Sequence, residues 1–150
     1  MPTVAHWPID ITDIAEFRRT RNPWVSLARD SIDHYRTGQA DRVRRLWDDE
    51  IAWTVDADGR VAGTWTGPDA VFDYHRLLER VSHGTFRQRL VALESSGGPI
   101  VECHVRTSAA RRGGRLDIPS LLVFEFAGGL LSRVTEIPGD RRAWAHFWAD

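Results

Sequence analysis

Residues 130–140, LLSRVTEIPGD, decide how the second half of the chain folds. Their alternation predicts a β-strand that runs into a turn and a helix cap. One face of this strand carries Leu131, Arg133, Thr135 and Ile137, and the other carries Ser132, Val134 and Glu136. Because Arg133 belongs in water, Glu136 is expected to point into the interior. An inward carboxylate makes Glu136 the first candidate for a functional residue.

Three segments before this stretch are predicted to be strands of the same antiparallel sheet. They cover residues 85–93, 100–109 and 115–126, and the turns SSGGP, RRGG and AGG separate the four strands. Alternation places Cys103 on an inner face between Val101 and Val105. On the third segment it turns Ile118, Ser120, Leu122 and Phe124 inward.

The first half of the chain is predicted to be mainly helical. Residues 1–21 form an irregular or briefly helical lead, and Asn22 and Pro23 then open a helix that runs to Thr37. A short helix over 40–47, a strand hairpin over 51–67 and a helix over 68–82 follow, and Asp140 caps a last helix. The order of these elements implies an α+β fold with the sheet curled over the helices.

Composition limits the function before any motif is considered. The 150 residues, of which 42% are hydrophobic, fit one globular domain. All twenty basic residues are arginine, which excludes a lysine Schiff base and a P-loop lysine. The arginines are scattered among acids, so nucleic acid is not an expected partner. One cysteine and the lack of a long apolar run predict a cytoplasmic protein with no membrane span.

Several weak motifs together resemble a known family. They are GQAD at 38–41, LWDDEIAW at 46–53, WTGPDAV at 65–71, GTF at 84–86 and GGLLSRVTEIPGD at 128–140. In this succession the chain resembles the nuclear-transport-factor-2-like superfamily, with its SnoaL-like and ketosteroid-isomerase-like branch closest. The resemblance implies a conical barrel, in which a curved antiparallel sheet wraps around N-terminal helices and encloses an apolar pocket. It also implies a homodimer, and it divides the chain into an extension, 1–21, and a domain, 22–150.

The resemblance does not carry a single reaction with it. The three positions that correspond to the ketosteroid isomerase base and oxyanion donors are Val55, Ser31 and Leu122, so that chemistry is lost. Asp56 follows the base position and would face inward only with a β-bulge.

The catalytic residues of two related enzyme classes are also incomplete in this sequence. The aspartate and arginine of limonene-epoxide-hydrolase-like enzymes fall near Cys103 and Val105, while their last-strand acid falls on Glu136. The acid of the SnoaL-like polyketide cyclases has no inward counterpart, because Asp117 and Glu125 have outward parity.

Two sets of candidate residues follow. Glu136 is the expected general acid or base, His75 its counterpart on the inner face of a helix, and Asp56 a third candidate. Each has a structural alternative, namely an ion-pair role for Glu136 and a core role for His75. The candidate ligand contacts are Trp24, Ser31, Tyr35, Trp53, Trp65, Tyr74, Cys103, Leu122, Phe124, Val134, Trp144 and Trp148.

We predict no catalytic metal, no cofactor and no covalent intermediate. The six histidines include no pair at ligand spacing on a helix, and Cys103 opposes its neighbours Glu102 and His104 on a strand.

The predicted function is that of a small-molecule pocket protein. We expect a cyclase, isomerase or hydrolase that acts on a hydrophobic, polyketide-like natural product by acid/base catalysis and by folding the substrate. Two other classes stay open. One is a non-catalytic binder of such a molecule, and the other is a dimeric interaction module whose cone is filled. An enzyme should hold Glu136 and His75 together in an open cavity, whereas a module should have a filled interior.

Overall fold

The computed structural model describes residues 6–11, 22–95 and 97–149. Within these ranges the chain forms four helices and a seven-stranded mixed sheet. The elements in chain order are β1 (Ile9–Ile11), α2 (Pro23–Arg36), α3 (Ala40–Leu46), β2 (Trp47–Val55), β3 (Gly63–Thr66), α4 (Pro68–Val81), β4 (Arg87–Ser95), β5 (Ile100–Arg111), β6 (Gly114–Ala127), β7 (Leu130–Pro138) and α5 (Arg141–Trp148). The α+β prediction is therefore confirmed.

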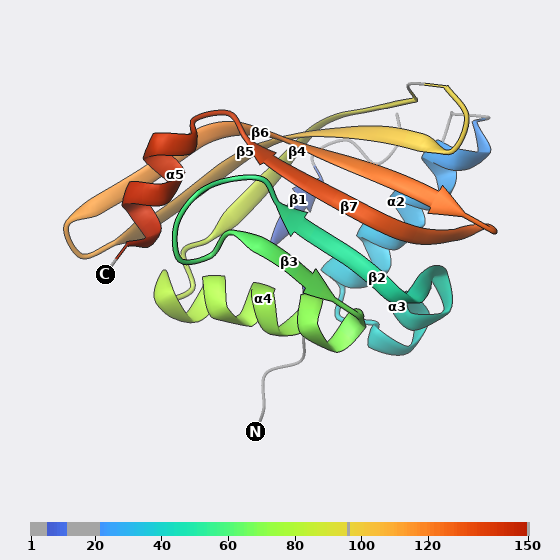
Figure 1. Ribbon diagram of the computed structural model, residues 1–150, viewed down its shortest axis with the longest axis horizontal. Helices are drawn as coiled ribbons and strands as arrows, with labels where there is room; N and C mark the ends of the chain where they lie inside the picture. The colour runs from blue at the N-terminus through green and yellow to red at the C-terminus, as the bar shows by residue number, and fades with distance from the viewer. Residues whose placement is uncertain (1–5, 12–21, 96, 150) are drawn as a thin grey trace.

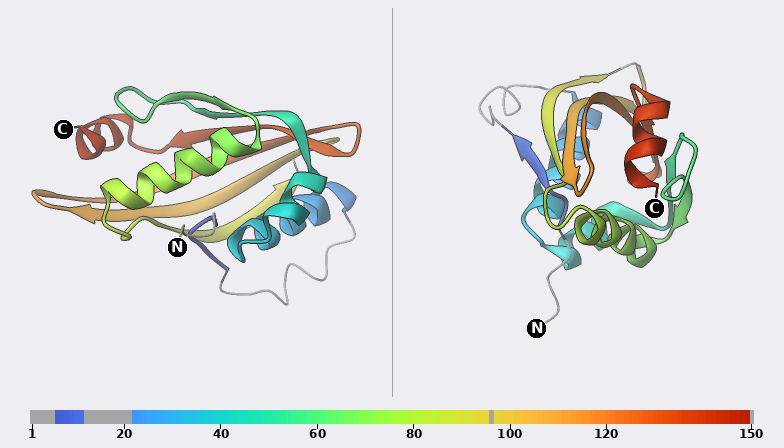
Figure 2. Two further views of the ribbon diagram at one scale, coloured as in Figure 1. Left: turned by 90° about the horizontal axis from the view of Figure 1, so that it is seen from below. Right: turned by 90° about the vertical axis from the view of Figure 1, so that its left-hand side faces the viewer.

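The sheet is long, strongly curled and open. Its strand order is β1-β4-β5-β6-β7-β2-β3, so β1 and β3 form the two edges. Helix α4 lies along the concave side, between the two edges, while α2 and α3 lie at one end of the molecule and α5 at the other (Figures 1 and 2). The concave face and the helices together enclose the core, which gives the expected cone.

The strand directions differ from the expectation in two places. The meander β4–β7 and the hairpin β2–β3 are antiparallel as predicted, but β2 pairs with β7 in parallel and β1 pairs with β4 in parallel. A tight turn forces neighbouring strands to be antiparallel, whereas strands far apart in the chain are free to pair in either direction. Local sequence patterns therefore gave no information on these two pairs.

The helix boundaries follow the predicted signals. Asn22 caps α2, because its side-chain oxygen accepts hydrogen bonds from the backbone N–H groups of Trp24 (2.9 Å) and Val25 (3.1 Å). Gly67, at φ 87°, leads into α4, which has Pro68 in its first turn. Asp140 caps α5 by accepting from the N–H of Ala143 at 2.9 Å.

The predicted alternation of β7 holds from Arg133 to its C-terminal end. Val134 and Glu136 are buried and point into the core, while Arg133 is exposed. Leu131 is an exception, since alternation predicts it on the outer face but it is only 1% exposed. Between Glu125 and Phe126 the pairing advances one residue on β6 but two on β7, from Arg133 to Leu131, so a bulge at Ser132 turns the start of β7 over.

The described part of the N-terminal segment belongs to the sheet. Strand β1 pairs with residues 88–90 of β4, so the prediction of an irregular or helical lead is wrong for residues 9–11. The rest of that prediction, residues 12–21, lies outside the described residues. Trp7 and Ile9 are 1% and 2% exposed and extend the core.

Over the described ranges, every helix is too short or too polar to span a membrane.

Candidate functional site

Glu136 lies on the inner face of β7 and is 1% exposed. Its Oε1 accepts hydrogen bonds from the hydroxyl of Tyr74 (2.8 Å) and from the indole Nε1 of Trp53 (3.1 Å). Its Oε2 accepts one from the side-chain amide of Gln88 (3.0 Å). These three donors come from α4, β2 and β4, so only the folded chain brings them to one carboxyl group.

The donors around Glu136 are all neutral. None of the salt bridges in the described ranges includes this residue, so the ion-pair role has no support there. Burial raises the pKa of Glu136 above its ordinary value, and the hydrogen bonds from Trp53, Tyr74 and Gln88 offset part of that rise. A carboxyl group of raised pKa exchanges a proton more readily near neutral pH than an ordinary glutamate does.

Gln88 connects Glu136 to two further groups. Its Oε1 accepts a hydrogen bond from the indole Nε1 of Trp7 at 2.7 Å, and its Nε2 also contacts Thr107 Oγ1 at 3.2 Å. The Thr107 hydroxyl then donates to Ser120 Oγ at 3.1 Å. A buried polar chain therefore runs from Trp7 through Gln88 to both Glu136 and the β5–β6 pair.

His75 faces the same interior from α4 and is 2% exposed. Its Nδ1 lies 2.7 Å from the Tyr35 hydroxyl and 3.2 Å from the carbonyl oxygen of Val71. Burial lowers the pKa of His75 to about 3, so the imidazole is neutral at physiological pH. Burial also raises the pKa of Tyr35, which keeps the phenol protonated and able to donate.

Aromatic rings bring His75 and Glu136 into one assembly. The imidazole ring lies 4.9 Å, centroid to centroid, from both Trp53 and Tyr74, which are two of the three donors to Glu136. We call the residues Trp7, Tyr35, Trp53, Tyr74, His75, Gln88 and Glu136 the central cluster. The predicted pair is thus joined through shared neighbours, and no direct hydrogen bond between the two side chains is seen.

The other predicted site residues fall into two groups. Cys103, Leu122, Phe124 and Val134 are buried on the inner face of the sheet, and buried Ser31 accepts a hydrogen bond from Trp47 Nε1 at 2.7 Å. Trp65 reaches the cluster only at its edge, with its ring 5.3 Å from that of Tyr74.

The remaining tryptophans among the predicted site residues, Trp24, Trp144 and Trp148, lie away from the central cluster. Half-buried Trp24 packs on Phe126 (5.9 Å between ring centroids). Trp144 and Trp148 pack on each other in α5, and Trp148 also contacts Phe86 and Phe147.

Asp56 does not belong to the site. The irregularity in β2 falls between Trp47 and Ala52, and the pairing with β7 then runs regularly to Val55. Without a bulge at its own position Asp56 points outward, where its carboxylate lies 2.9 Å from Arg141. Asp56 therefore lies on the surface, outside the central cluster, because the strand keeps its parity to the end.

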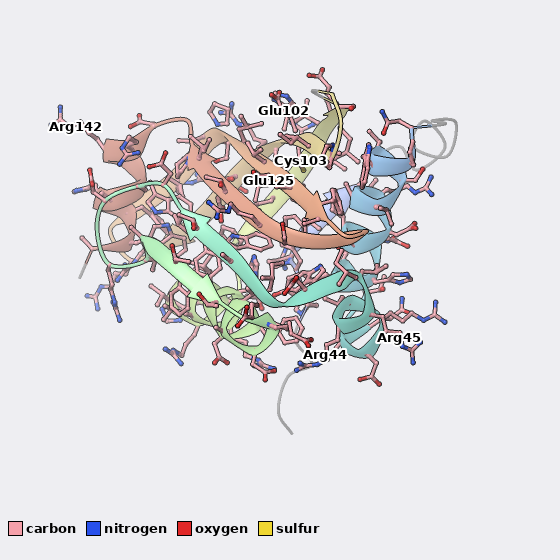
Figure 3. All side chains as sticks on the ribbon, turned by 45° about the vertical axis from the view of Figure 1, so that its right-hand side comes forward. Arg44, Arg45, Glu102, Cys103, Glu125 and Arg142 are labelled. Atoms are coloured by element: carbon pink, nitrogen blue, oxygen red, sulfur yellow. The ribbon has the colours of Figure 1, made fainter. Side chains whose placement is uncertain are left out.

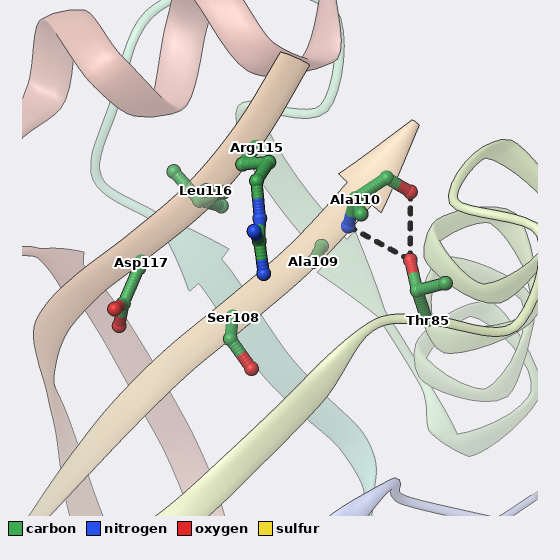
Figure 4. A pocket seen from close by; sticks show the side chains of 7 residues that line it. All are labelled: Thr85, Ser108, Ala109, Ala110, Arg115, Leu116 and Asp117. Carbon is green, nitrogen blue, oxygen red and sulfur yellow. Dashed lines mark hydrogen bonds between the residues drawn. The ribbon is translucent and has the colours of Figure 1, made fainter. Parts of the chain in front are cut away.

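The apolar pocket expected at the centre is occupied by an indole. The ring of Trp7 lies 5.4 Å from Trp53, 5.9 Å from His75, 6.0 Å from Tyr35 and 6.3 Å from Phe124. A hollow of about 530 Å³ lies elsewhere, beside the β5–β6 hairpin (Figure 4). Its lining includes Thr85, whose hydroxyl is tied to the backbone of Ala110, and none of the predicted site residues.

A second polar group lies on the outer face of the sheet. Glu94, Glu102 and His104 come together across β4 and β5. Each offers one atom that could bind a metal ion, and these atoms lie within 4.8 Å of one another. His104 Nε2 lies 3.4 Å from Glu94 Oε2 and 3.5 Å from Glu102 Oε2, so the two carboxyl groups flank one imidazole nitrogen. Residue spacing along the chain does not predict this group, because cross-strand pairing creates it. Glu102 and inward-facing Cys103 are labelled in Figure 3.

Two members of the central cluster were missed by the sequence analysis. Gln88 carried a usable signal, because Phe86, Gln88 and Leu90 alternate with exposed Arg87 and Arg89, which places the amide on the inner face. Trp7 carried none, since it lies in a short segment without periodicity.

Comparison with known proteins supports the fold. Neither a family model nor a curated protein sequence matches this chain. Among solved structures, Bal32a from a soil-derived mobile gene cassette is 28% identical, with a TM-score of 0.75 over 84% of this chain and 96% of that one.

Two further structures share the fold at lower identity. A nuclear-transport-factor-2-like (NTF2-like) protein from Burkholderia xenovorans LB400 is 14% identical, with a TM-score of 0.68 over 83% of this chain and 95% of its own. A chain from Jannaschia sp. CCS1, provisionally described as a SnoaL-like polyketide cyclase, is 13% identical, with a TM-score of 0.66 over 88% and 99%.

Proposed function

This chain has the fold of the NTF2-like and SnoaL-like proteins, and we propose that its interior is a small-molecule site for cofactor-free acid/base chemistry. The observation that carries the proposal is Glu136, a buried carboxyl group held by three neutral donors. A carboxylate without a cation partner is costly to bury, so a structural role alone gives little reason to keep it.

Glu136 is the proposed general base. As a carboxylate it would take a proton from a carbon next to a substrate carbonyl, and as the resulting acid it would return that proton to another atom. Donors already in place at Oε1 need no rearrangement when the charge changes, which favours rapid exchange. Isomerisation and aldol-type ring closure both begin with this step, so the proposal covers a cyclase or an isomerase. Acid-assisted hydrolysis is the variant in which Glu136 activates water.

His75 is the proposed counterpart. A neutral imidazole with a pKa of about 3 is a poor base, but together with Tyr35 it can donate a hydrogen bond to a substrate oxygen. The aromatic walls from Trp53, Tyr74 and Phe124 suit a flat, hydrophobic natural product. We also propose that residues 22–150 form the functional domain and that the protein is a homodimer. The lone cysteine supports a cytoplasmic location.

Proton exchange on a model ketone tests this function. The probe is 2-tetralone, a flat bicyclic ketone with acidic α-protons, and the measurement is the rate of deuterium uptake at its α-carbons by proton NMR. The wild-type protein should accelerate uptake above buffer. Glu136→Gln should lower the protein-catalysed rate about 10²-fold or more, the usual scale for losing a general base.

Asp56→Asn is the matched control, because it makes the same acid-to-amide change at a residue on the surface. It should exchange at the wild-type rate. Equal rates for wild type and Glu136→Gln would contradict the catalytic role, and binding of 2-tetralone without exchange would identify a binder.

One observation favours the interaction module as a second candidate. Trp7 fills the centre of the cone, as expected for a domain that binds no small molecule. A protein that neither binds 2-tetralone nor accelerates its exchange, with Trp7 present or replaced, would be such a module.

A further inference from the structure

The residue at the centre of the site comes from the N-terminal segment that leads into the edge strand β1. We call residues 7–11 the N-terminal strap. Except for Trp7, every member of the central cluster comes from α2, α4 or the sheet strands β2, β4 and β7. Trp7 alone enters from the strap, yet it makes ring contacts with α2, β2, α4 and β6.

Trp7 is bound as a ligand would be bound. Its ring is nearly perpendicular to Trp53 (84°) and roughly parallel to Phe124 (29°), and its edge N–H donates to Gln88 Oε1 at 2.7 Å. By contrast, the buried indole Nε1 atoms of Trp144 and Trp148 have no hydrogen-bond partner in the described structure. Filling a core therefore does not require such a bond, and the Trp7 position is specific for a flat ring with one donor.

The strap is attached in a way that allows release. β1 has three residues, pairs in parallel and lies at the edge of the sheet, where β4 keeps its other partner, β5, along its whole length. Two backbone hydrogen bonds attach the strap next to β1. One runs from Trp7 N to Tyr35 O (3.1 Å), and the other runs from Gln88 N to Pro8 O (2.9 Å). Short edge elements open at lower free energy than central strands do.

We propose that the N-terminal strap is an exchangeable occupant of the site, and that the ligand binds by displacing Trp7. The ligand class is a planar, fused-ring aromatic molecule with one hydroxyl or N–H group on its edge. Its donor takes the place of the indole N–H on Gln88 Oε1, and its rings take the place of the indole between Trp53 and Phe124. Glu136 then lies one hydrogen bond beyond that donor, through Gln88. This inference rests on the proposed function, because it assumes that the interior is a ligand site.

Exchange makes the strap a competitor that lowers the apparent affinity. Only the fraction of molecules with the strap released can bind, so removing the indole should tighten binding. Holding the strap down should weaken it. These opposite expectations define the test.

The first arm removes the indole. The probe is 2-naphthol, which has two fused rings and one donor, and its affinity is measured by titration calorimetry. Trp7→Ala should bind it at least 10-fold more tightly than wild type. Trp148→Ala, which deletes an equally buried indole outside the central cluster, should show no gain. On Trp7→Ala, 2-methoxynaphthalene, which lacks the donor, should bind about 10-fold more weakly than 2-naphthol.

The second arm locks the strap. Asp10 and Arg89 are partners across β1 and β4, and both are exposed, so Asp10→Cys with Arg89→Cys places two thiols at a separation that a disulfide can bridge. The oxidised protein should bind 2-naphthol at least 10-fold more weakly than the same protein after reduction. Asp10→Cys alone, treated with the same oxidant, should behave as wild type.

Equal binding by the oxidised and reduced proteins would overturn the exchange, as would Trp7→Ala binding no tighter than wild type. If Trp7→Ala does not fold, as judged by near-ultraviolet circular dichroism, the redox comparison decides alone. The two proposals fail separately. If exchange of 2-tetralone depends on Glu136 but not on the disulfide, the proposed function holds and the displacement of the strap is contradicted. If the disulfide weakens binding but no such exchange occurs, the displacement holds and the catalytic role is contradicted.

Discussion

Residue by residue, the central cluster is matched for hydrogen-bond polarity. Trp53, Tyr74 and Gln88 all donate to Glu136, and Gln88 turns its one acceptor, Oε1, toward Trp7. A change of donor or acceptor at one position therefore conflicts with the next group along the chain. This matching makes the role of Glu136 testable without a substrate.

Exchanging the amide and the acid should preserve the network. Glu136→Gln sets an NH₂ group against that of Gln88, and Gln88→Glu sets two carboxylates together, so each change alone should lower the free energy of unfolding. In the double variant the new amide at position 136 donates to the new carboxylate at position 88, which also accepts from Trp7. We expect the double variant to recover about 1–3 kcal/mol of the summed single costs, measured by urea unfolding. Simple additivity would contradict the network, and ketone exchange should stay lost in the double variant.

His75 should determine part of the acid sensitivity. An unfolded histidine titrates near pH 6.5, whereas the pKa of His75 in the fold is about 3. Between these values only the unfolded chain gains the proton, so the stability that His75 provides is full above pH 6.5 and is lost as the pH falls. The loss should approach about 1.4 kcal/mol per pH unit within this interval.

His75→Gln removes this titration and keeps a hydrogen-bonding side chain. Its unfolding free energy should depend less on pH than that of the wild type between pH 6 and 4. Glu136 acts in the opposite sense, since its raised pKa favours the fold at low pH and that contribution is lost as the pH rises through the folded value. Because both proteins contain Glu136, its contribution cancels in the comparison, and parallel curves would contradict the assignment to His75.

Among the elements, the four-stranded meander sets which side chains reach the site. Inward positions follow strict alternation along β5 and β6, and the register pairs Cys103 with Leu122 and Leu122 with Glu136. A slip of one residue in β5 would bring Glu102 or His104 to the inner face and displace the packing around Glu136. The placement of Cys103 therefore reports on the register of the whole meander.

Cys103 should react slowly with thiol reagents in the native protein. It is fully buried, and both this burial and the nearby Glu136 raise the pKa of its thiol well above the ordinary value, so little thiolate forms. The measurement is the rate of labelling by a disulfide reagent at pH 8, with and without urea. His104→Cys in a Cys103→Ala background is the control, because that side chain is 39% exposed and should label quickly. Native labelling of Cys103 as fast as in urea would contradict the register.

At the scale of the whole molecule, the sheet has one face filled by the cluster and one face left outside. The outer face carries half-buried Leu121 and Val123 beside Glu125 on β6, and Val91 on β4 is 60% exposed. Arginines project at separate places, with Arg44 and Arg45 on α3 and Arg142 on α5 (Figure 3). The outer face of the sheet is mixed, because these apolar side chains lie among the ion pairs Arg106–Asp117 and Arg133–Glu125.

We expect a two-fold symmetric dimer through this outer face, because association would cover half-buried Leu121 and Val123. Sedimentation at micromolar concentration should give twice the mass of 17.1 kDa. Val123→Glu sets like charges beside Glu125 and should shift the protein to a monomer, while Val91→Glu, which lies away from β6 and β7, should have less effect. A wild-type monomer at that concentration would contradict the prediction.

The sequence by itself determined the elements and the faces. Alternation, caps and glycine turns act over a few residues, so they sufficed for the helices, for the antiparallel meander and for the inward direction of Glu136 and His75. They also indicated Tyr74 and Trp53 as interior residues. Each of these properties depends on the chain within a turn or two of the residue concerned.

Only the tertiary structure decided what meets at the site. The parallel pairings of β1 and β2, the three donors to Glu136 and the entry of Trp7 join segments that are tens of residues apart, and no local pattern encodes such contacts. Asp56 is a further example. The direction of its side chain depended on whether β2 forms a bulge where it pairs with β7, and the local sequence does not determine this. Local preferences set which way a side chain points, whereas packing of the whole chain sets what it touches.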